Sequence, residues 1–162
     1  MYEYLTDAVV LERQPVGDKD SRVSFFTKRY GKLVGRAKSA RRITSKLSGH
    51  IEPGMVLKLR AVERRGIQIV DALKEGKVQV DIANLRFLNQ LLGDGEPDRR
   101  IWNALTSRTF SWSTLLGHLG WDTLYARCTS CGQNPESFHI RSQEFFCTWC
   151  ASRLAQEEVL YM

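Results

Sequence analysis

Residues 22–38 alternate between apolar and polar side chains, which is the pattern of a β-hairpin. Strand side chains point to opposite faces with a period of two. The Arg29-Tyr30-Gly31 segment supplies the turn, because Gly31 is free to adopt a positive φ. The inner face of the predicted hairpin holds Val23, Phe25, Thr27, Leu33, Gly35 and Ala37.

The outer face of this hairpin concentrates positive charge. Between Lys28 and Lys46 the chain has eight basic residues and no acidic residue. Because cations follow phosphates and an exposed aromatic ring can stack on a base, we predict a nucleic-acid-binding surface here. Two alternatives stay open: cations that only solvate an exposed strand, and a Phe26 ring that packs beneath a helix. The predicted DNA-binding residues are Arg22, Phe26, Lys28, Arg29, Lys32, Arg36, Lys38, Arg41, Arg42 and Lys46.

The charge of the whole chain is distributed unevenly. Residues 1–78 hold 17 Lys and Arg against 9 Asp and Glu, whereas residues 79–162 hold 7 against 9. The positive field is therefore confined to the N-terminal half, where it can concentrate a polyanion.

Five short strands are predicted in the N-terminal half, with a long connection, residues 39–53, that forms a loop or a short helix. Five strands of this kind fit a closed barrel of the oligonucleotide-binding (OB) type. A barrel like that of SH3 domains fits the strand count nearly as well, and periodicity does not separate the two. The predicted strands are residues 5–12, 22–28, 32–38, 55–62 and 67–73.

From residue 78 onward the apolar residues recur at helical spacing. Helices are expected near residues 80–92, over 98–106 and over 111–119, with a further terminal helix over 153–161. The fold class is therefore α+β, with an N-terminal five-stranded β-barrel, of the OB or the SH3-like type, over residues 1–77. A short α-helical region and a C-terminal zinc finger are expected in residues 78–162.

All four cysteines fall into two C-x2-C pairs, Cys128/Cys131 and Cys147/Cys150, separated by 15 residues. Two such turns aim four thiolates at one point, so this spacing predicts a four-cysteine Zn²⁺ site, a zinc finger over residues 128–150. Four thiolates leave no position for water, so the zinc is expected to be structural. Redox-active pairs or disulfides are the rival interpretations, and His139 is expected to be a bystander.

Several classes of protein are disfavoured. No stretch approaches the ~18 apolar residues of a membrane helix, and acids stand near Met1 where a secretory signal would carry Lys or Arg. We therefore expect a cytoplasmic protein. The chain has no G-x4-G-K-[ST], H-E-x-x-H or G-x-S-x-G motif, and its three histidines lack partners at motif spacing. We predict that it is not an enzyme.

Three runs of residues, toward the two ends of the chain, carry a resemblance to a known family of bacterial recombination mediators. The runs Thr6–Arg13 and Pro15–Arg42 look like the RecO N-terminal domain, and Leu115–Trp121 with the two C-x2-C pairs is similar to its C-terminal zinc module. The resemblance implies an OB-fold that binds single- and double-stranded DNA, a helical domain, and annealing of complementary strands without catalysis. It also implies two partners, RecR and the single-stranded DNA-binding protein. The chain itself is expected to be a monomer. The helical part here is shorter than in the family.

Two other function classes remain at this stage. A basic OB sheet can also grip RNA, as in an RNA- or ribosome-associated protein. The chain could also be a zinc-stapled protein-interaction module whose charge serves solubility alone.

Overall fold

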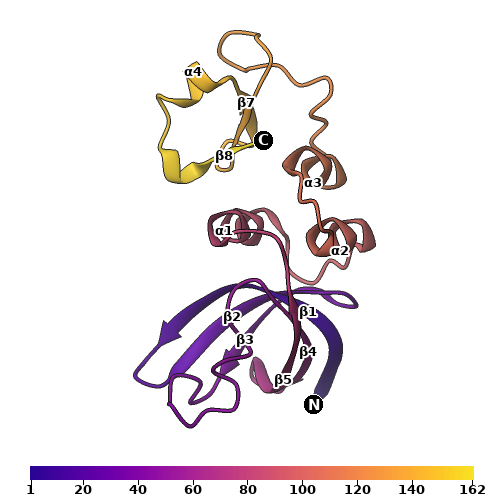
Figure 1. The fold of residues 1–162 in the computed structure, drawn as a ribbon, viewed down its shortest axis with the longest axis vertical. Helices are drawn as coiled ribbons and strands as arrows, with labels where there is room; N and C mark the ends of the chain where they lie inside the picture. Colours follow the sequence, from indigo (N-terminus) through magenta and orange to yellow (C-terminus); the bar gives the residue numbers. More distant parts are fainter. The chain divides into compact units, whose positions relative to one another are not determined.

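The chain divides into two units, Met1–Arg108 and Thr109–Met162, and the computed structural model describes every residue of both (Figure 1). The first unit holds five strands, β1 (Tyr2–Val16), β2 (Asp20–Thr27), β3 (Gly31–Ala37), β4 (Met55–Glu63) and β5 (Ile67–Lys77), and two helices, α1 (Ile82–Leu91) and α2 (Arg99–Thr106). The second holds α3 (Trp112–His118), β6 (Ser137–His139), β7 (Glu144–Phe146), α4 (Thr148–Ala151), a 3₁₀ turn (Gln156–Glu158) and β8 (Val159–Tyr161).

The five strands of the first unit form one mixed sheet that closes on itself. Their order is β1-β2-β3-β5-β4, and β4 pairs back with β1. All pairings are antiparallel except β3 with β5, where Gly35 lies opposite Ile67 and Arg36 opposite Gln68. The prediction of five strands in an α+β chain is confirmed. The connection over residues 39–53 consists of turns and bends without a helix.

The inner face of this sheet is an apolar core, as the alternating pattern predicts. Phe25 and Leu57, on different strands, are almost completely buried in it. Burying one such side chain stabilises the fold by about 1.5–3 kcal/mol. The other buried members are Ala8, Val10, Val23, Ala37, Ala40, Ile51, Leu59, Ala61, Ile69 and Ala72.

The outer face of the β2–β3 hairpin is covered along its middle. Helix α1 packs against β1, and Asp81 caps it by accepting a hydrogen bond from the Asn84 backbone N–H. Phe26 lies on this outer face opposite Val9 and is fully buried. The prediction that Phe26 is exposed is therefore wrong, and the alternative of a buried ring holds: β2 buries Phe25 in the core and Phe26 on its outer face, while Arg22 near its start is exposed.

The β2–β3 turn brings the backbone of the connection between α1 and α2 very close. Gly31 has φ +70°, which confirms the predicted turn glycine. A Cβ atom at this position would lie 2.3 Å from the backbone carbonyl carbon of Glu96. The adjacent Lys32 forms a β-bridge with Asp94, so the connection is fixed on the turn.

The second unit is built on a small three-stranded sheet in the order β7-β6-β8. The Phe138 ring is fully buried and lies 5.1 Å, centroid to centroid, from both Trp121 and Phe145. The predicted terminal helix over residues 153–161 is wrong: the segment forms a 3₁₀ turn and then β8, whose Leu160 is buried opposite Phe138.

The first compact unit extends to Arg108 and includes α1 and α2, and the predicted domain division at residue 77 stays a prediction. No helix in the structure is long and apolar enough to cross a membrane.

Candidate nucleic-acid interface and metal centre

The structure splits the predicted basic surface into two ends separated by a covered middle. Lys32, in the middle, donates hydrogen bonds from Nζ to the carbonyl oxygens of Asn89 (2.7 Å) and Leu92 (3.2 Å). Its side chain is only 14% exposed. Lys32 therefore holds α1 on the hairpin and, like Phe26, is removed from the candidate surface.

Most of the remaining cations gather where β3 ends, and we call them the loop-side basic group. Arg22 and Arg36 lie opposite each other on β2 and β3 and are both exposed. A hollow of about 870 Å³ opens beside them and is lined by Met1, Arg36, Lys38, Val62, Arg64, Arg65, Gly66, Ile67 and Gln68. The loop-side basic group is Arg22, Arg36, Lys38, Arg41, Arg42, Lys46, Arg64 and Arg65, all exposed.

Asp20 organises the start of the basic segment. Its carboxylate accepts hydrogen bonds from the Ser39 backbone N–H (2.8 Å) and from Arg36 Nε (2.7 Å). Ser39 has φ +52°, a conformation that L-residues rarely adopt, so this bond holds a strained turn. The Ser39 N–H and the Arg36 guanidinium keep the pKa of Asp20 below its usual value, so the residue stays a carboxylate.

Arg13 anchors the rest of the basic segment from beneath. Its guanidinium donates to the carbonyl oxygens of Ser48 and Ala40, both at 3.1 Å, and pairs with Glu52. The Arg13 side chain is 13% exposed, so it serves the loop and not a ligand. Arg41 in turn donates to the carbonyl oxygen of Gly17, 2.9 Å away in the β1–β2 turn.

Arg64 and Arg65 were missed as site residues when only the sequence was considered. They lie in the β4–β5 turn, and the parallel pairing of β3 with β5 brings this turn beside Arg36. Parallel pairing joins strands far apart in sequence, which hydrophobic periodicity does not report. The available signal was the Arg-Arg-Gly turn itself, which places two adjacent cations in a connection between two strands.

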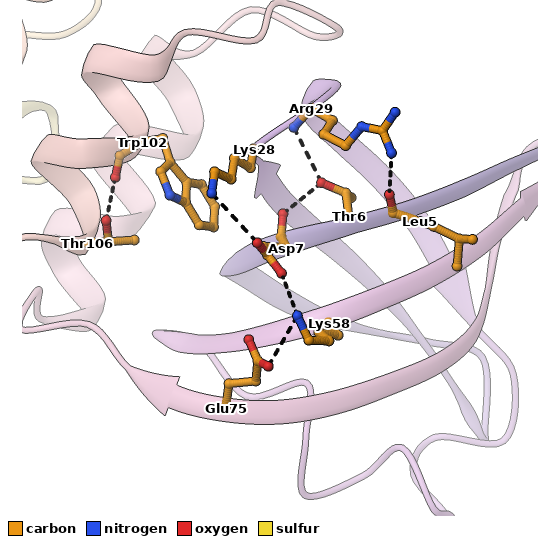
Figure 2. A network of polar contacts seen from close by, with 9 residues as sticks. All are labelled: Leu5, Thr6, Asp7, Lys28, Arg29, Lys58, Glu75, Trp102 and Thr106. Atoms are coloured by element: carbon orange, nitrogen blue, oxygen red, sulfur yellow. Dashed lines mark hydrogen bonds and ion pairs between the residues drawn. The ribbon is translucent and has the colours of Figure 1, made fainter.

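At the other end of the hairpin, Lys28 and Arg29 line a second hollow of about 580 Å³. Figure 2 shows Lys28 pointing toward Asp7, and Arg29 toward the carbonyl oxygen of Leu5. We call Lys28, Arg29, Lys58 and Arg99, which line this hollow, the turn-side basic group. Asp7 lies between them, 3.9 Å from Lys28 Nζ and 3.2 Å from Lys58 Nζ. Glu75 also pairs with Lys58, at 3.3 Å.

The four cysteines of the second unit converge as their spacing predicts. Their sulfur atoms all lie within 4.8 Å of one another, with Cys131 and Cys147 3.6 Å apart. Sulfurs bound at about 2.3 Å to a tetrahedral zinc would be about 3.8 Å apart, so the donor set fits that metal. His139 is not part of the cluster and instead contacts Glu158 (3.1 Å) and Ser142 (2.8 Å).

The thiols of this cluster have unequal acidity. Burial and the neighbouring thiols of Cys147, Cys131 and Cys128 raise the pKa of Cys150 to about 12. Burial opposes ionisation of Cys128, but backbone N–H groups, led by that of Cys147, lower its pKa to about 6. Four thiolates this close repel one another, and a divalent cation is what would stabilise them together.

Comparison with known proteins gives matches to one family, RecO. Residues 1–77 match the family model described as "Recombination protein O N terminal". The chain is 28% identical over 176 residues to the DNA repair protein RecO of Thermodesulfovibrio yellowstonii, a match that covers 92% of this chain and 70% of that protein. It is 27% identical over 159 residues to the DNA repair protein RecO of Geobacter sulfurreducens, covering 82% and 65%, and 25% identical over 152 residues to that of Geobacter metallireducens, covering 78% and 62%. The matches span about two thirds of these relatives.

Proposed function

We propose that this chain is a recombination mediator of the RecO family and not a catalytic enzyme, and that it binds single- and double-stranded DNA and anneals complementary strands in recombinational repair. The match of residues 1–77 to the family model and the similarity to RecO proteins support this proposal. The observation that carries the proposal is the loop-side basic group. Of its eight exposed cations, four line a hollow of about 870 Å³, namely Arg36, Lys38, Arg64 and Arg65, and the other four lie on β2 and on the segment after β3.

We infer that the closed sheet is an OB-fold barrel. OB folds bind oligonucleotides on strands 2 and 3 and on the loops between strands 1 and 2 and between strands 4 and 5. The loop-side basic group occupies corresponding positions: Arg22 and Arg36 on β2 and β3, Arg41 against the β1–β2 turn, and Arg64 in the β4–β5 turn. This agreement between charge and position supports DNA binding over a purely solvating role for the cations.

The mechanism follows from electrostatics. Cations that neutralise phosphates release condensed counterions, which supplies sequence-independent affinity. Two complementary strands repel each other, and a cationic surface that screens this repulsion lets them pair. Such a step needs no nucleotide hydrolysis, and the chain carries no nucleotide-binding motif of the P-loop type.

A salt titration and an annealing assay together test this proposal. If the surface neutralises about four to six phosphates of a single strand, log affinity should fall against log salt with a slope of about −3 to −4. Pairing of complementary oligonucleotides should be faster with the protein than without it, and equally fast with and without ATP. No acceleration over spontaneous pairing, or tighter binding to RNA than to DNA of the same sequence, would contradict the proposed function.

We also propose that the four-cysteine cluster holds one structural Zn²⁺, bound by Cys128, Cys131, Cys147 and Cys150. The support is the spacing of the sulfurs and the absence of a fifth donor in the cluster. Zinc bound there would stabilise a unit with a small apolar core, and elemental analysis of protein purified without chelators would test for it. RecR and the single-stranded DNA-binding protein are proposed partners on family grounds, testable by co-sedimentation with each purified protein.

A further inference from the structure

We propose that the turn-side basic group and a neighbouring cluster of tyrosines form a second binding site for single-stranded DNA, so that one chain can hold two strands. The inference rests on the proposed annealing function and adds the place where the second strand binds. Four observations carry it: separation from the loop-side basic group, charge, aromatic rings and a shared arginine.

The two basic groups are separate along the hairpin. Arg22, opposite Arg36, is six residues from Lys28, and a strand rises about 3.3 Å per residue, which places the two ends about 20 Å apart. Between them, Phe26 is fully buried and the Lys32 ammonium bonds to α1. A strand bound at one end therefore has no continuous basic path along this face to the other.

The turn-side basic group keeps an excess of positive charge. Four cations line the hollow and Asp7 is the one acid that lines it; Glu75 reaches Lys58 from the edge. The side chains of Lys28 and Lys58 are 47% and 61% exposed. Exposed ion pairs contribute little, typically 0–1 kcal/mol, so a phosphate can replace Asp7 as the partner of either lysine at small cost.

Three tyrosines lie beside this hollow and supply stacking surfaces. The ring centroids of Tyr2 and Tyr4 are 4.8 Å apart, and that of Tyr30 lies 5.0 Å from Tyr4 and 6.3 Å from Tyr2. The Tyr4 hydroxyl donates to Glu63 (2.6 Å), which fixes the cluster, while Tyr2 is 53% exposed. Stacking of a base on an aromatic side chain is worth about 1–3 kcal/mol and tolerates any sequence.

Arg29 joins the two features. It lines both the basic hollow and a second hollow of about 530 Å³ that Tyr2, Tyr4 and Tyr30 line, and its guanidinium lies 5.6 Å from the Tyr30 ring centroid. A phosphate on Arg29 would therefore place the adjoining base over the tyrosines. Cations beside exposed aromatic rings are the usual composition of single-strand sites.

The test measures whether one protein holds two strands. The DNA is oligothymidylate of about 16 nucleotides, which is the upper site size of one OB fold. One batch is labelled with a donor dye and another with an acceptor dye, and the two batches are mixed. Energy transfer between the two dyes is measured separately for three proteins, with DNA in excess in each case: wild type, the double variant Arg29→Ala/Arg99→Ala, and Tyr2→Ala. Arg60→Ala is the matched control, because Arg60 is an exposed cation on the same strand as Lys58 but pairs with Glu3 outside the hollow. Melting temperatures establish that each variant is folded.

We expect energy transfer in wild type and in Arg60→Ala, and its loss in Arg29→Ala/Arg99→Ala. Annealing should slow about tenfold in that double variant through loss of two phosphate contacts, while affinity for the first strand stays within about twofold. Tyr2→Ala should weaken energy transfer without changing the salt dependence.

Three results overturn the second site while leaving the proposed function intact: one strand per wild-type protein, unchanged energy transfer in the double variant, or displacement by an oligoglutamate peptide in preference to the second strand. The last outcome would assign the hollow to an acidic protein partner. Failure of wild type to bind any strand would instead overturn the proposed function itself.

Discussion

The two units of this chain are stabilised and charged in opposite ways. Residues 1–108 hold 21 Lys and Arg against 13 Asp and Glu, a net charge of +8, around a sheet with a continuous apolar core. Residues 109–162 hold 3 against 5, a net charge of −2, and part of their small core consists of three of the four cysteines. The first unit has the excess of positive charge that binding a polyanion requires, whereas the second has a small negative net charge and a core to which cysteines contribute.

This contrast predicts that the proposed metal centre and the proposed DNA-binding surface can be perturbed independently of each other. A unit with few apolar residues to bury commonly depends on a metal or disulfides for its stability. Perturbing the cysteines should therefore affect folding of one unit, and perturbing the cations should affect binding by the other.

The largest effect is expected from Cys147→Ser. Structural zinc contributes about 10–16 kcal/mol of apparent binding free energy in small fingers, so loss of one thiolate should remove most of the metal and unfold the second unit. Cys147 also caps α4, and serine is a good N-cap residue, so the substitution removes the ligand and keeps the cap. Zinc content and limited proteolysis measure the outcome.

Ser130→Ala is the control for this variant, because Ser130 lies between the first pair of cysteines and is exposed. It should retain full metal content. If Cys147→Ser also abolished single-strand binding by the N-terminal unit, the two units would depend on each other, and the contrast drawn between them would be wrong.

The next effect in size is that of Arg36→Glu/Lys38→Glu on DNA binding. Reversing two of the eight loop-side cations should weaken single-strand affinity about 100-fold at low salt, or about 2.7 kcal/mol, for all sequences alike, because phosphates carry no sequence information. Lys77→Glu/Arg86→Glu makes the same change in net charge at exposed positions on β5 and α1. Filter binding should show near-wild-type affinity for that control, and equal losses in both variants would mean that only net charge matters.

The sequence predicted the strands and the cysteine cluster because both depend on local patterns. Alternation from residue 22 onward gave the hairpin, and C-x2-C spacing gave a cluster whose sulfurs are within 4.8 Å. The pattern did not determine whether the outer face of β2 is exposed. Phe26 sits among cations in sequence, and only the packing of α1, some 60 residues later, removes it and Lys32 from the surface.

The sequence predicted the positive charge of the candidate site but not the arrangement of its cations. A count of cations gives one basic face, whereas the structure gives two ends with a covered middle. Arg64 joins one end through the parallel β3–β5 pairing, and Arg99 joins the other from the start of α2. Contacts between distant segments of this kind leave no periodic signal in a single sequence.

A third prediction concerns the β2–β3 turn, which carries Lys28 and Arg29 of the turn-side basic group. Gly31→Ala should destabilise the first unit by about 2–3 kcal/mol, since a positive φ costs about 1–2 kcal/mol for alanine and the new Cβ would overlap the Glu96 backbone. Gly17→Ala is a matched control, because Gly17 has φ +57° and no atom within 4 Å of the added Cβ. Urea unfolding of both variants should isolate the overlap as their difference. Equal losses would show that the connection after α1 is free to move away from the turn.

The smallest effect expected in the first unit comes from Asp98, the N-cap of α2. Its carboxylate accepts hydrogen bonds from the Arg100 side chain (2.8 Å) and from the backbone N–H groups of Arg100 (2.7 Å) and Ile101 (3.4 Å). The Arg100 guanidinium and these N–H groups lower the pKa of Asp98 to about 2, against partial burial. A lowered folded-state pKa means that the charged form stabilises the fold above the unfolded pKa of about 4, and that this contribution is lost as pH falls toward 2.

Asp98→Ala should therefore cost about 1 kcal/mol at pH 7 and less at pH 3 in urea unfolding, with Asp98→Asn intermediate because it keeps an acceptor without the charge. Metal content of the second unit should be unchanged. An Asp98→Ala penalty that is as large at pH 3 as at pH 7 would assign the effect to lost packing, and a loss of zinc would show that the two units are coupled through their folding.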